Sequence, residues 1–420
     1  MRPRDGARRR PDHERVLVTS ASVLSPLAEE LDGFTEALLQ GRSGVCLAEE
    51  KTPAAWLHGF TLDGWCARNL ADDPAGATGL RATAGRAAPP AQTAACVAVQ
   101  ALRAAGLTAG PRTGVLVAGS NLALDHQART VRGFQRRPGA LRASYALTHL
   151  DIDTVGTVSE VTGACAEGWT VGGGSASGSL AVIQAARMLA SGWVDHCLVV
   201  APMAELSDTE REAFRRAGAM SSGDGSRAPH EVCRPFDADR SGFVYGQAAA
   251  ALVMERADTA RGRDAPVLAE VLGCGQRLDA KRGTEPSSTG QVAAIRAALA
   301  DAGCAPEEVD YINAHATGSV LGDEIEAQSL RTVFGTATPP VNSTKPLVGH
   351  CLSAAGAVEI VATMAQMRAG ACHPNPNLDS PIDDRLGLVG RTAVEHRIRT
   401  ALSSSFAFGG INASVLIRAA

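Results

Sequence analysis

A turn of three glycines followed by a long apolar segment is the feature that most constrains how this chain can fold. Gly172–Gly174 stand directly before Ser175, and residues 179–189 are rich in leucine, isoleucine, valine and alanine at helical spacing. Glycines let the backbone turn sharply and approach a neighbouring group closely. An apolar run with this periodicity is typical of a buried helix. We therefore expect a tight turn that enters a buried helix.

Ser175 has two interpretations at such a helix entry. The first turn of a helix has free N–H groups and the positive end of the helix dipole, a position that suits a nucleophile. The alternative is that Ser175 or Ser177 only caps the helix, which is a common role for serine. This stretch alone does not decide between them.

Strands and helices alternate along the rest of the chain. Short continuous apolar runs predict strands near 15–20, 113–119, 193–201, 242–254, 267–273, 309–314 and 413–418. Helical patterns lie at 31–39, 91–105, 290–302 and 353–368, and residues 204–232 are polar and rich in Gly and Ser, which predicts a long surface excursion. Alternation with buried strands indicates α/β architecture. Two passes of the pattern predict duplicated halves at 15–262 and 263–420.

The composition excludes several classes of protein. The chain has 420 residues, 45% hydrophobic and 20% charged, with a formal net charge of −4, which is globular and argues against a general nucleic-acid binder. No apolar run is long enough to span a membrane, and the basic residues 1–14 predict a disordered tail rather than a signal peptide. Ten cysteines without CxxC pairs predict free thiols in the cytoplasm and no metal site.

Three later segments combine glycines, hydroxyls and two histidines: 313–319 (NAHATGS), 342–350 (NSTKPLVGH) and 405–412 (SFAFGGIN). His315 and His350 each follow a strand end and precede a turn. A lone histidine of this kind is more often structural. Two of them downstream of a serine at a helix entry favour a site built from all three.

These motifs, in this order, resemble the β-ketoacyl-acyl-carrier-protein synthases, or ketosynthases, of the thiolase-like condensing family. Residues 234–244 (RPFDADRSGFV) resemble a further family signature, and 41–44 (GRSG) another. The resemblance covers 15–418. It implies a duplicated α/β/α/β/α fold of five layers, and a homodimer or a heterodimer with another ketosynthase subunit.

One departure from the family pattern bears on function. The family's nucleophile is a cysteine at the start of a buried helix, and Ser175 stands at the matching position. Cys165 is a decoy, because no helix is expected to start there. A thiol has a pKa of about 8.5 that a helix N-terminus lowers, whereas an alcohol needs a close general base. Elongation by this chain is therefore expected to be impaired.

The retained residues imply the other half of the chemistry. In the family, His315 and His350 donate hydrogen bonds to the thioester carbonyl of the malonyl unit and stabilise the enolate formed as carbon dioxide leaves. Lys345 and Glu326 match positions that support the histidines, and a buried Lys–Glu pair would orient them. Thr317 and Ser319 match hydroxyls that bind the phosphopantetheine arm.

Other positions match less closely. Phe408 matches the gating aromatic of a loop in which this chain has alanine for the first glycine. The departures are Gln247, Ala316, Pro346 and Ala407. They indicate a specialised member of the family.

Five arginines between residues 129 and 142 are candidates for receiving an acidic carrier protein, with Arg136 and Arg142 singled out. An ordinary solvated face is the alternative.

The resemblance implies a ketosynthase-like acyltransferase-family enzyme of polyketide or fatty-acid-like biosynthesis. It would decarboxylate malonyl-carrier protein without efficient elongation, with no bound cofactor and the substrate held on the carrier's phosphopantetheine. A non-elongating partner of an intact ketosynthase, like a chain-length factor, is one alternative. A serine-nucleophile acyltransferase or condensing enzyme is another. A general α/β-hydrolase fits less well. Gly173 and Ser175 match the start of a G-x-S-x-G elbow, but Ser177 stands where the motif requires its last glycine.

Overall fold

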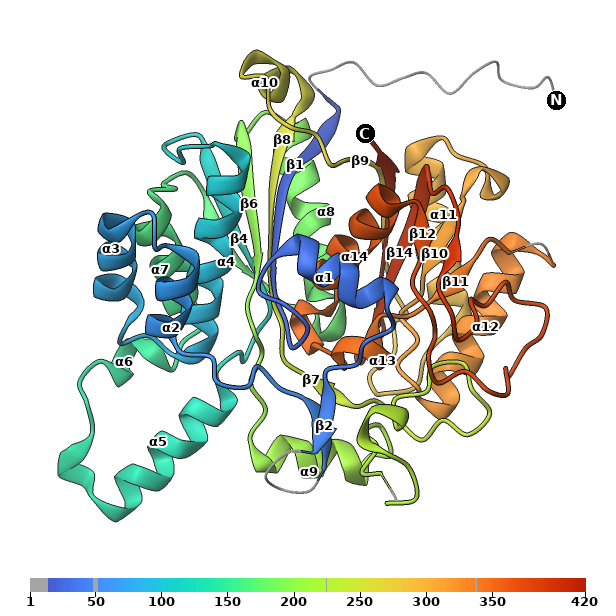
Figure 1. The fold of residues 1–420 in the computed structure, drawn as a ribbon, viewed down its shortest axis with the longest axis horizontal. Helices are drawn as coiled ribbons and strands as arrows, with labels where there is room; N and C mark the ends of the chain where they lie inside the picture. The colour runs from blue at the N-terminus through green and yellow to red at the C-terminus, as the bar shows by residue number, and fades with distance from the viewer. Residues whose placement is uncertain (1–13, 48–51, 224, 337) are drawn as a thin grey trace.

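A ten-stranded mixed sheet runs through the computed structural model, which describes residues 14–47, 52–223, 225–336 and 338–420 (Figure 1). In spatial order the strands are β11 (Val341–Asn342), β10 (Tyr311–Asn313), β14 (Thr400–Ala407), β15 (Ile411–Ala419), β9 (Ala269–Leu278), β1 (Val16–Leu24), β8 (Ala249–Arg256), β6 (His196–Ala201), β4 (Thr113–Ala118) and β5 (Gly168–Val171).

The sheet divides into two halves of the same plan. The strands β1, β8, β6, β4 and β5 precede residue 262 and the other five follow it, and β1 and β9 pair antiparallel where the halves meet. In each half, one strand lies between two parallel neighbours: β4 between β5 and β6, and β10 between β11 and β14. The predicted duplicated α/β fold is confirmed.

Helices form three layers around the two halves of the sheet (Figure 1). The central layer is α8 (Ser177–Ala190) and α14 (Ala355–Ala369): α8 contacts β6 and β15, and α14 contacts β8 and β14. One outer layer contains α4 (Pro89–Ala105) and α7 (Ile152–Thr162), and the other contains α11 (Ser288–Ala302) and α12 (Val320–Phe334). The arrangement is the predicted five-layered, thiolase-like one.

The remaining elements decorate this framework. The helices are α1 (Leu31–Leu39), α2 (Leu62–Asn69), α3 (Pro74–Ala84), α5 (Leu124–Arg136), α6 (Tyr145–Thr148), α9 (Asp208–Arg216), α10 (Ala257–Gly262) and α13 (Lys345–Val348). Two small sheets contain β2 (Val45–Leu47), β3 (Pro53–Ala55) and β7 (Tyr245–Gly246), and β12 (Ala371–Cys372) with β13 (Val394–Glu395).

The central helices touch through their backbones. A Cβ added to Gly178 on α8 would lie 2.4 Å from the amide nitrogen of Ala357, and one on Gly356 of α14 would lie 2.6 Å from that of Ser179. Only glycine fits at such an approach. The apolar sequences of both helices are explained by burial: residues 355–367 of α14 and most of α8 are buried, largely against strands.

Two predicted segments differ from the structure. The expected single strand at 242–254 is two strands, because β7 pairs with β3 in a small sheet before β8 joins the large one. Residues 204–232 are not simply a surface excursion. They contain α9, which a capping box between Ser207 and Glu210 starts, and Leu206 and Met220 are buried against Phe243.

Three further predictions concern a terminal tail, a membrane-spanning segment and a metal site. The tail expected at residues 1–14 lies outside the described residues, apart from Glu14. In the part of the chain that the structure covers, no helix has the length and apolar character needed to cross a bilayer. The same part contains no group of three or more His, Cys, Asp or Glu side chains placed to hold a metal ion.

Candidate active site

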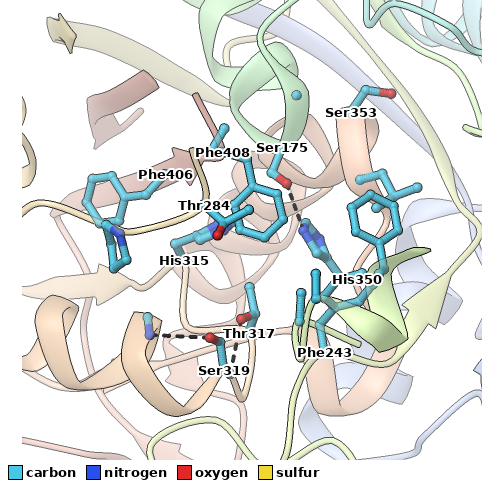
Figure 2. Close-up of a pocket in the computed structure, with 18 of the residues that line it drawn as sticks. Ser175, Phe243, Thr284, His315, Thr317, Ser319, His350, Ser353, Phe406 and Phe408 are labelled. Carbon is cyan, nitrogen blue, oxygen red and sulfur yellow. Dashed lines mark hydrogen bonds between the residues drawn. The ribbon is translucent and has the colours of Figure 1, made fainter. Parts of the chain in front are cut away.

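A cavity of about 530 Å³, lined from both halves of the fold, contains Ser175, His315 and His350 (Figure 2). Ser175 lies at the entry to α8. His315 follows β10, and His350 follows α13. The three residues are 175 positions apart at most, and the fold brings their side chains to one place. The structure therefore assembles the predicted Ser–His–His constellation.

The turn before α8 holds Ser175 in place. Gly174 has a φ of +54°, which a side chain would strain, and it opens a short 3-10 turn at Gly174–Ala176. Ser177 Oγ accepts the N–H of Gly173 at 2.9 Å and donates to the carbonyl of Gly174 at 2.7 Å. Neither serine caps α8 with its side chain, so the capping interpretation is wrong. The Ser175 hydroxyl instead lies 2.9 Å from His350 Nε2.

The two histidine rings meet edge to face in the cavity, with centroids 5.5 Å apart and an interplanar angle of 80°. Both are buried. Burial lowers the pKa of each well below 6.5, and the positive charge of Lys345 lowers both further. Each imidazole is therefore neutral near pH 7 and has one ring proton to donate. Such donors stabilise a developing oxyanion without bringing a second charge into the site.

Two buried carboxylates shape the loop that carries His315. Glu326 accepts the backbone N–H groups of His315 at 2.8 Å and Ala316 at 2.7 Å. Asp323 accepts those of Thr317 at 3.0 Å and Phe236 at 2.8 Å. Burial raises the pKa of Glu326 to about 8 and that of Asp323 to about 6. Asp323 was not predicted as a site residue, although its spacing from Glu326 places both on one side of α12.

The ion pair of Lys345 differs from the expected one. Lys345 Nζ donates to Glu359 on α14, and both side chains are 1% exposed. Glu326 does not take this role, because its two oxygens accept backbone N–H groups. Glu359 could have been noticed in the sequence as the single acidic residue inside the apolar run of α14.

Three predicted substrate-binding residues line the same cavity. Ser319 accepts the N–H of Gly322 at 3.3 Å and caps α12, and Thr317 Oγ1 accepts the N–H of Ser319 at 3.2 Å. Phe408, in the turn between β14 and β15, is 45% exposed, with its ring centroid 6.3 Å from that of Phe214. In Figure 2, Thr317 and Ser319 lie below Ser175, and Phe408 lies beside it.

Arg136 and Arg142 do not line this cavity. Arg136 ends α5, a helix without buried residues that projects from the body of the fold (Figure 1). Arg142 borders a separate hollow of about 320 Å³ together with Arg86 and Arg137. Cys165 is exposed and precedes strand β5 rather than a helix, which confirms its rejection.

Other residues of the cavity were not singled out in the sequence. They are Ser120, Asn121, Glu205, Phe243 and Ser353. Phe243 packs edge-on against His350, with centroids 5.2 Å apart. Phe243 belongs to the 234–244 signature, whereas no local motif marks the other four, which reach the cavity from segments distant in the sequence.

Known proteins match this chain over nearly its whole length. The family models described as beta-ketoacyl synthase, N-terminal domain and C-terminal domain match residues 13–260 and 268–379. The chain is 42% identical over 307 residues to "Polyketide biosynthesis malonyl-ACP decarboxylase PksF" of Bacillus subtilis, covering 73% of this chain and 74% of the relative. It is 31% identical over 428 residues to 3-oxoacyl-[acyl-carrier-protein] synthase 2 of Coxiella burnetii, covering 97% and 99%.

The fold also matches a solved structure of the same family. The ishigamide ketosynthase/chain length factor matches with a TM-score of 0.86 and 28% identity, covering 97% of this chain and 99% of that one. The sequence matches include both halves of the duplicated fold and the segments that carry Ser175, His315 and His350. From its sequence and its fold, the chain belongs to the β-ketoacyl synthase family.

Proposed function

We propose that this chain decarboxylates malonyl-carrier protein to acetyl-carrier protein and does not elongate acyl chains efficiently. The observation that carries the proposal is the pairing of two neutral buried histidines with Ser175, at the position where the resemblance expects a cysteine nucleophile. Decarboxylation needs oxyanion donors. Elongation needs, in addition, an acyl group on the nucleophile.

The histidines would act on the thioester carbonyl of the malonyl group. His315 and His350 each donate a ring N–H to that oxygen. As the C2–C3 bond breaks, its electron pair forms a double bond between C2 and the thioester carbon, and the carbonyl π pair moves onto the oxygen to give an enolate. Carbon dioxide leaves, and C2 takes a proton from solvent to give the acetyl thioester. Glu326 and the Lys345–Glu359 pair would hold the two histidine-bearing segments, and neither Lys345 nor Glu359 lines the cavity.

Ser175 is a poor acyl acceptor in this setting. Its hydroxyl lies 2.9 Å from His350 Nε2, but Nδ1 of His350 has no hydrogen-bond partner among the described residues. A Ser–His pair that forms an acyl-enzyme normally has a third group that orients the histidine and stabilises its protonated form. The missing third member supports decarboxylation over a serine-based acyltransferase.

The proposed reaction also requires a carrier protein and a path for its phosphopantetheine arm. The name of the Bacillus subtilis relative includes malonyl-ACP decarboxylase, and a phosphopantetheine arm would pass Thr317, Ser319 and Phe408 to reach Ser175. Arg136 and Arg142 would receive the acidic carrier. A cytoplasmic setting fits the ten cysteines, all of which are free thiols.

A role as a partner subunit is the second candidate. It is favoured by the likeness to a ketosynthase/chain length factor structure and by the exposed edge strand β5, whose Trp169 is 36% exposed and open to a second subunit. A partner without catalysis of its own has no need of both histidines, and their presence favours decarboxylation. Either a homodimer or a heterodimer is compatible with the proposed reaction.

Intact-mass measurement on the carrier protein tests the proposal. Purified protein is mixed with malonyl-carrier protein, and the arm is expected to lose carbon dioxide. The matched control is the double variant His315→Ala/His350→Ala, which should leave malonyl on the arm. An unchanged malonyl arm with the parent protein, together with a gain of activity when an intact ketosynthase is added, would support the partner-subunit role instead.

A further inference from the structure

Four polar residues interrupt the otherwise largely apolar lining of the cavity beyond Ser175. Ser120, Asn121, Glu205 and Ser353 line the same cavity as Ser175, next to Leu124 and Leu352. An enzyme that elongates acyl chains must hold an alkyl chain beside its nucleophile, and an alkyl chain is stabilised by apolar walls. The four polar residues are therefore unexpected in a chamber built for a hydrocarbon.

Ser353 lies on the opposite side of Ser175 from Thr317 and Ser319, the two residues proposed to bind the arm (Figure 2). The 3-10 turn at Leu352–Ala354 packs against the 3-10 turn that holds Ser175. A Cβ on Gly119 would lie 2.9 Å from Ser353 Oγ, so Ser353 adjoins the segment that carries Ser120 and Asn121. Figure 2 places Ser353 above Ser175 and the pair Thr317 and Ser319 below it. The cavity thus has an arm end and a far end.

Ser353 is the clearest sign of how the far end is built. The residue is 6% exposed, and its hydroxyl has no hydrogen-bond partner among the described residues. A buried hydroxyl of this kind is costly unless water or a ligand meets it. Water can enter here, because Ser120 and Asn121 beside it are exposed in the single chain.

Two further groups keep the far end polar. Asn121 has a φ of +55°, and Asp151 holds it there by accepting the N–H groups of Asn121 at 2.7 Å and Leu122 at 2.9 Å. Glu205 is 6% exposed and accepts the N–H of His126 at 3.0 Å. Burial raises the pKa of the Glu205 carboxyl to about 7, so at neutral pH it is a polar group in either protonation state.

We propose that the far end of this cavity excludes alkyl chains and restricts the site to malonyl and other short acyl groups, with Ser353 and Asn121 as specificity-determining residues. An alkyl chain entering there would displace water from both side chains and leave their polar atoms unpaired. A malonyl thioester needs no space beyond Ser175. The inference rests on the proposed function in that the site takes acyl thioesters, but it can be tested without decarboxylation.

The test uses the Ser175→Cys variant as a reporter of which acyl groups reach the turn. Acetyl, hexanoyl and decanoyl thioesters of N-acetylcysteamine are offered, and acylation of the introduced thiol is followed by intact mass. We expect acetylation to be at least about tenfold faster than decanoylation, the discrimination expected from one or two unpaired polar groups. Adding Ser353→Ala, or Ser353→Ala with Asn121→Gly, should reduce that ratio by about tenfold.

A matched control removes another buried hydroxyl without a partner. Thr344 Oγ1 is buried and has none among the described residues, and Thr344 does not line the cavity. Thr344→Val in the same background should keep the preference for acetyl, and thermal melts should show that each variant folds. Equal rates for acetyl and decanoyl in the reporter would overturn the inference, as would a preference that survives both Ser353 variants.

The two proposals can fail separately. Equal acylation rates together with intact malonyl decarboxylation by the parent protein would remove only the inference about the far end. Selectivity for short chains in a parent protein that leaves malonyl-carrier protein unchanged would remove the proposed decarboxylation and leave the inference standing.

Discussion

Lys345 on α13 and Glu359 on α14 form an ion pair in which each side chain is 1% exposed. Burial raises the pKa of Glu359, and Lys345 opposes that rise. The same lysine is a source of the lowered pKa values of His315 and His350. The pair therefore connects the packing of the central layer to the protonation of the site, and it does so without lining the cavity.

Breaking this pair from one side should destabilise the protein strongly. Lys345→Met leaves the Glu359 carboxyl buried without its cation, which typically costs about 3–5 kcal/mol of unfolding free energy. The double variant Lys345→Met/Glu359→Leu should recover most of that loss. Urea unfolding of the three proteins measures the difference. If the double variant were as unstable as the single one, an unpaired charge would not be the cause.

The protonation of the histidines should depend on Lys345. In the parent, the pKa values of His315 and His350 lie well below 6.5. The unfolded chain takes up these protons first on acidification, so the free energy of unfolding should fall as the pH drops below about 6.5. In Lys345→Met/Glu359→Leu both pKa values should rise, while burial still holds them under 6.5. NMR of ring-labelled histidine measures them, and ordinary titration near 6.5 in the parent would contradict the prediction.

The two histidines should carry most of the decarboxylation rate. His315→Ala and His350→Ala each remove one oxyanion donor and should lower the rate of acetyl-carrier protein formation by about 10²-fold or more. The measurement is single-turnover conversion of malonyl-carrier protein. His373 is a matched control: it is fully buried and outside the cavity. His373→Asn should leave the rate per folded molecule unchanged. Unaltered rates in both alanine variants would show that the oxyanion role is wrong.

Arg136 at the end of α5 and Arg142 after it should matter only for carrier-bound substrate. Arg136→Glu/Arg142→Glu should raise KM for malonyl-carrier protein several-fold, because like charges then oppose the approach of an acidic partner. It should leave kcat/KM for malonyl-N-acetylcysteamine unchanged. Arg397→Glu, another exposed arginine, serves as the control. An equal loss on both substrates would indicate damage to the fold, and no loss on either would make this an ordinary solvated surface.

Ser175→Cys should restore some condensation with short acyl groups. The thiol would stand at the entry of α8, where the helix dipole favours a thiolate, and 2.9 Å is the present separation of the side-chain oxygen from His350 Nε2. An acyl chloromethyl ketone should label the variant and not the parent. With an acetyl donor and malonyl-carrier protein, a β-ketoacyl product is expected by mass. Labelling without any product would place the defect elsewhere and favour the partner-subunit role.

The sequence predicts the framework better than it predicts the contacts. The helix expected at 31–39 is α1 with the same bounds, because its apolar spacing and the glycine after it are local signals. The run 242–254 misled, since an apolar run cannot show that Tyr245 pairs with Ala54 while Ala249 joins the large sheet. The choice of strand partner is a long-range event.

The site follows the same rule. His315 and His350 stand in recognisable motifs and were predicted. The partner of Lys345 depends on how α13 lies against α14, and no spacing in the sequence encodes it. Ser353 and Asn121 become neighbours of Ser175 only through the packing of two 3-10 turns and a strand end. The role of Arg136 and Arg142 stays a prediction.

The glycine contact between the central helices fixes how closely the two halves of the molecule approach each other. Gly178 belongs to the first half and lies two residues after the turn that holds Ser175. Gly356 belongs to the second half and follows His350 by six positions. These two helices meet backbone to backbone, and no side chain at the contact can be made smaller to admit a larger one. A single added methyl at either position would act as a spacer and would move the serine of one half relative to the histidine of the other.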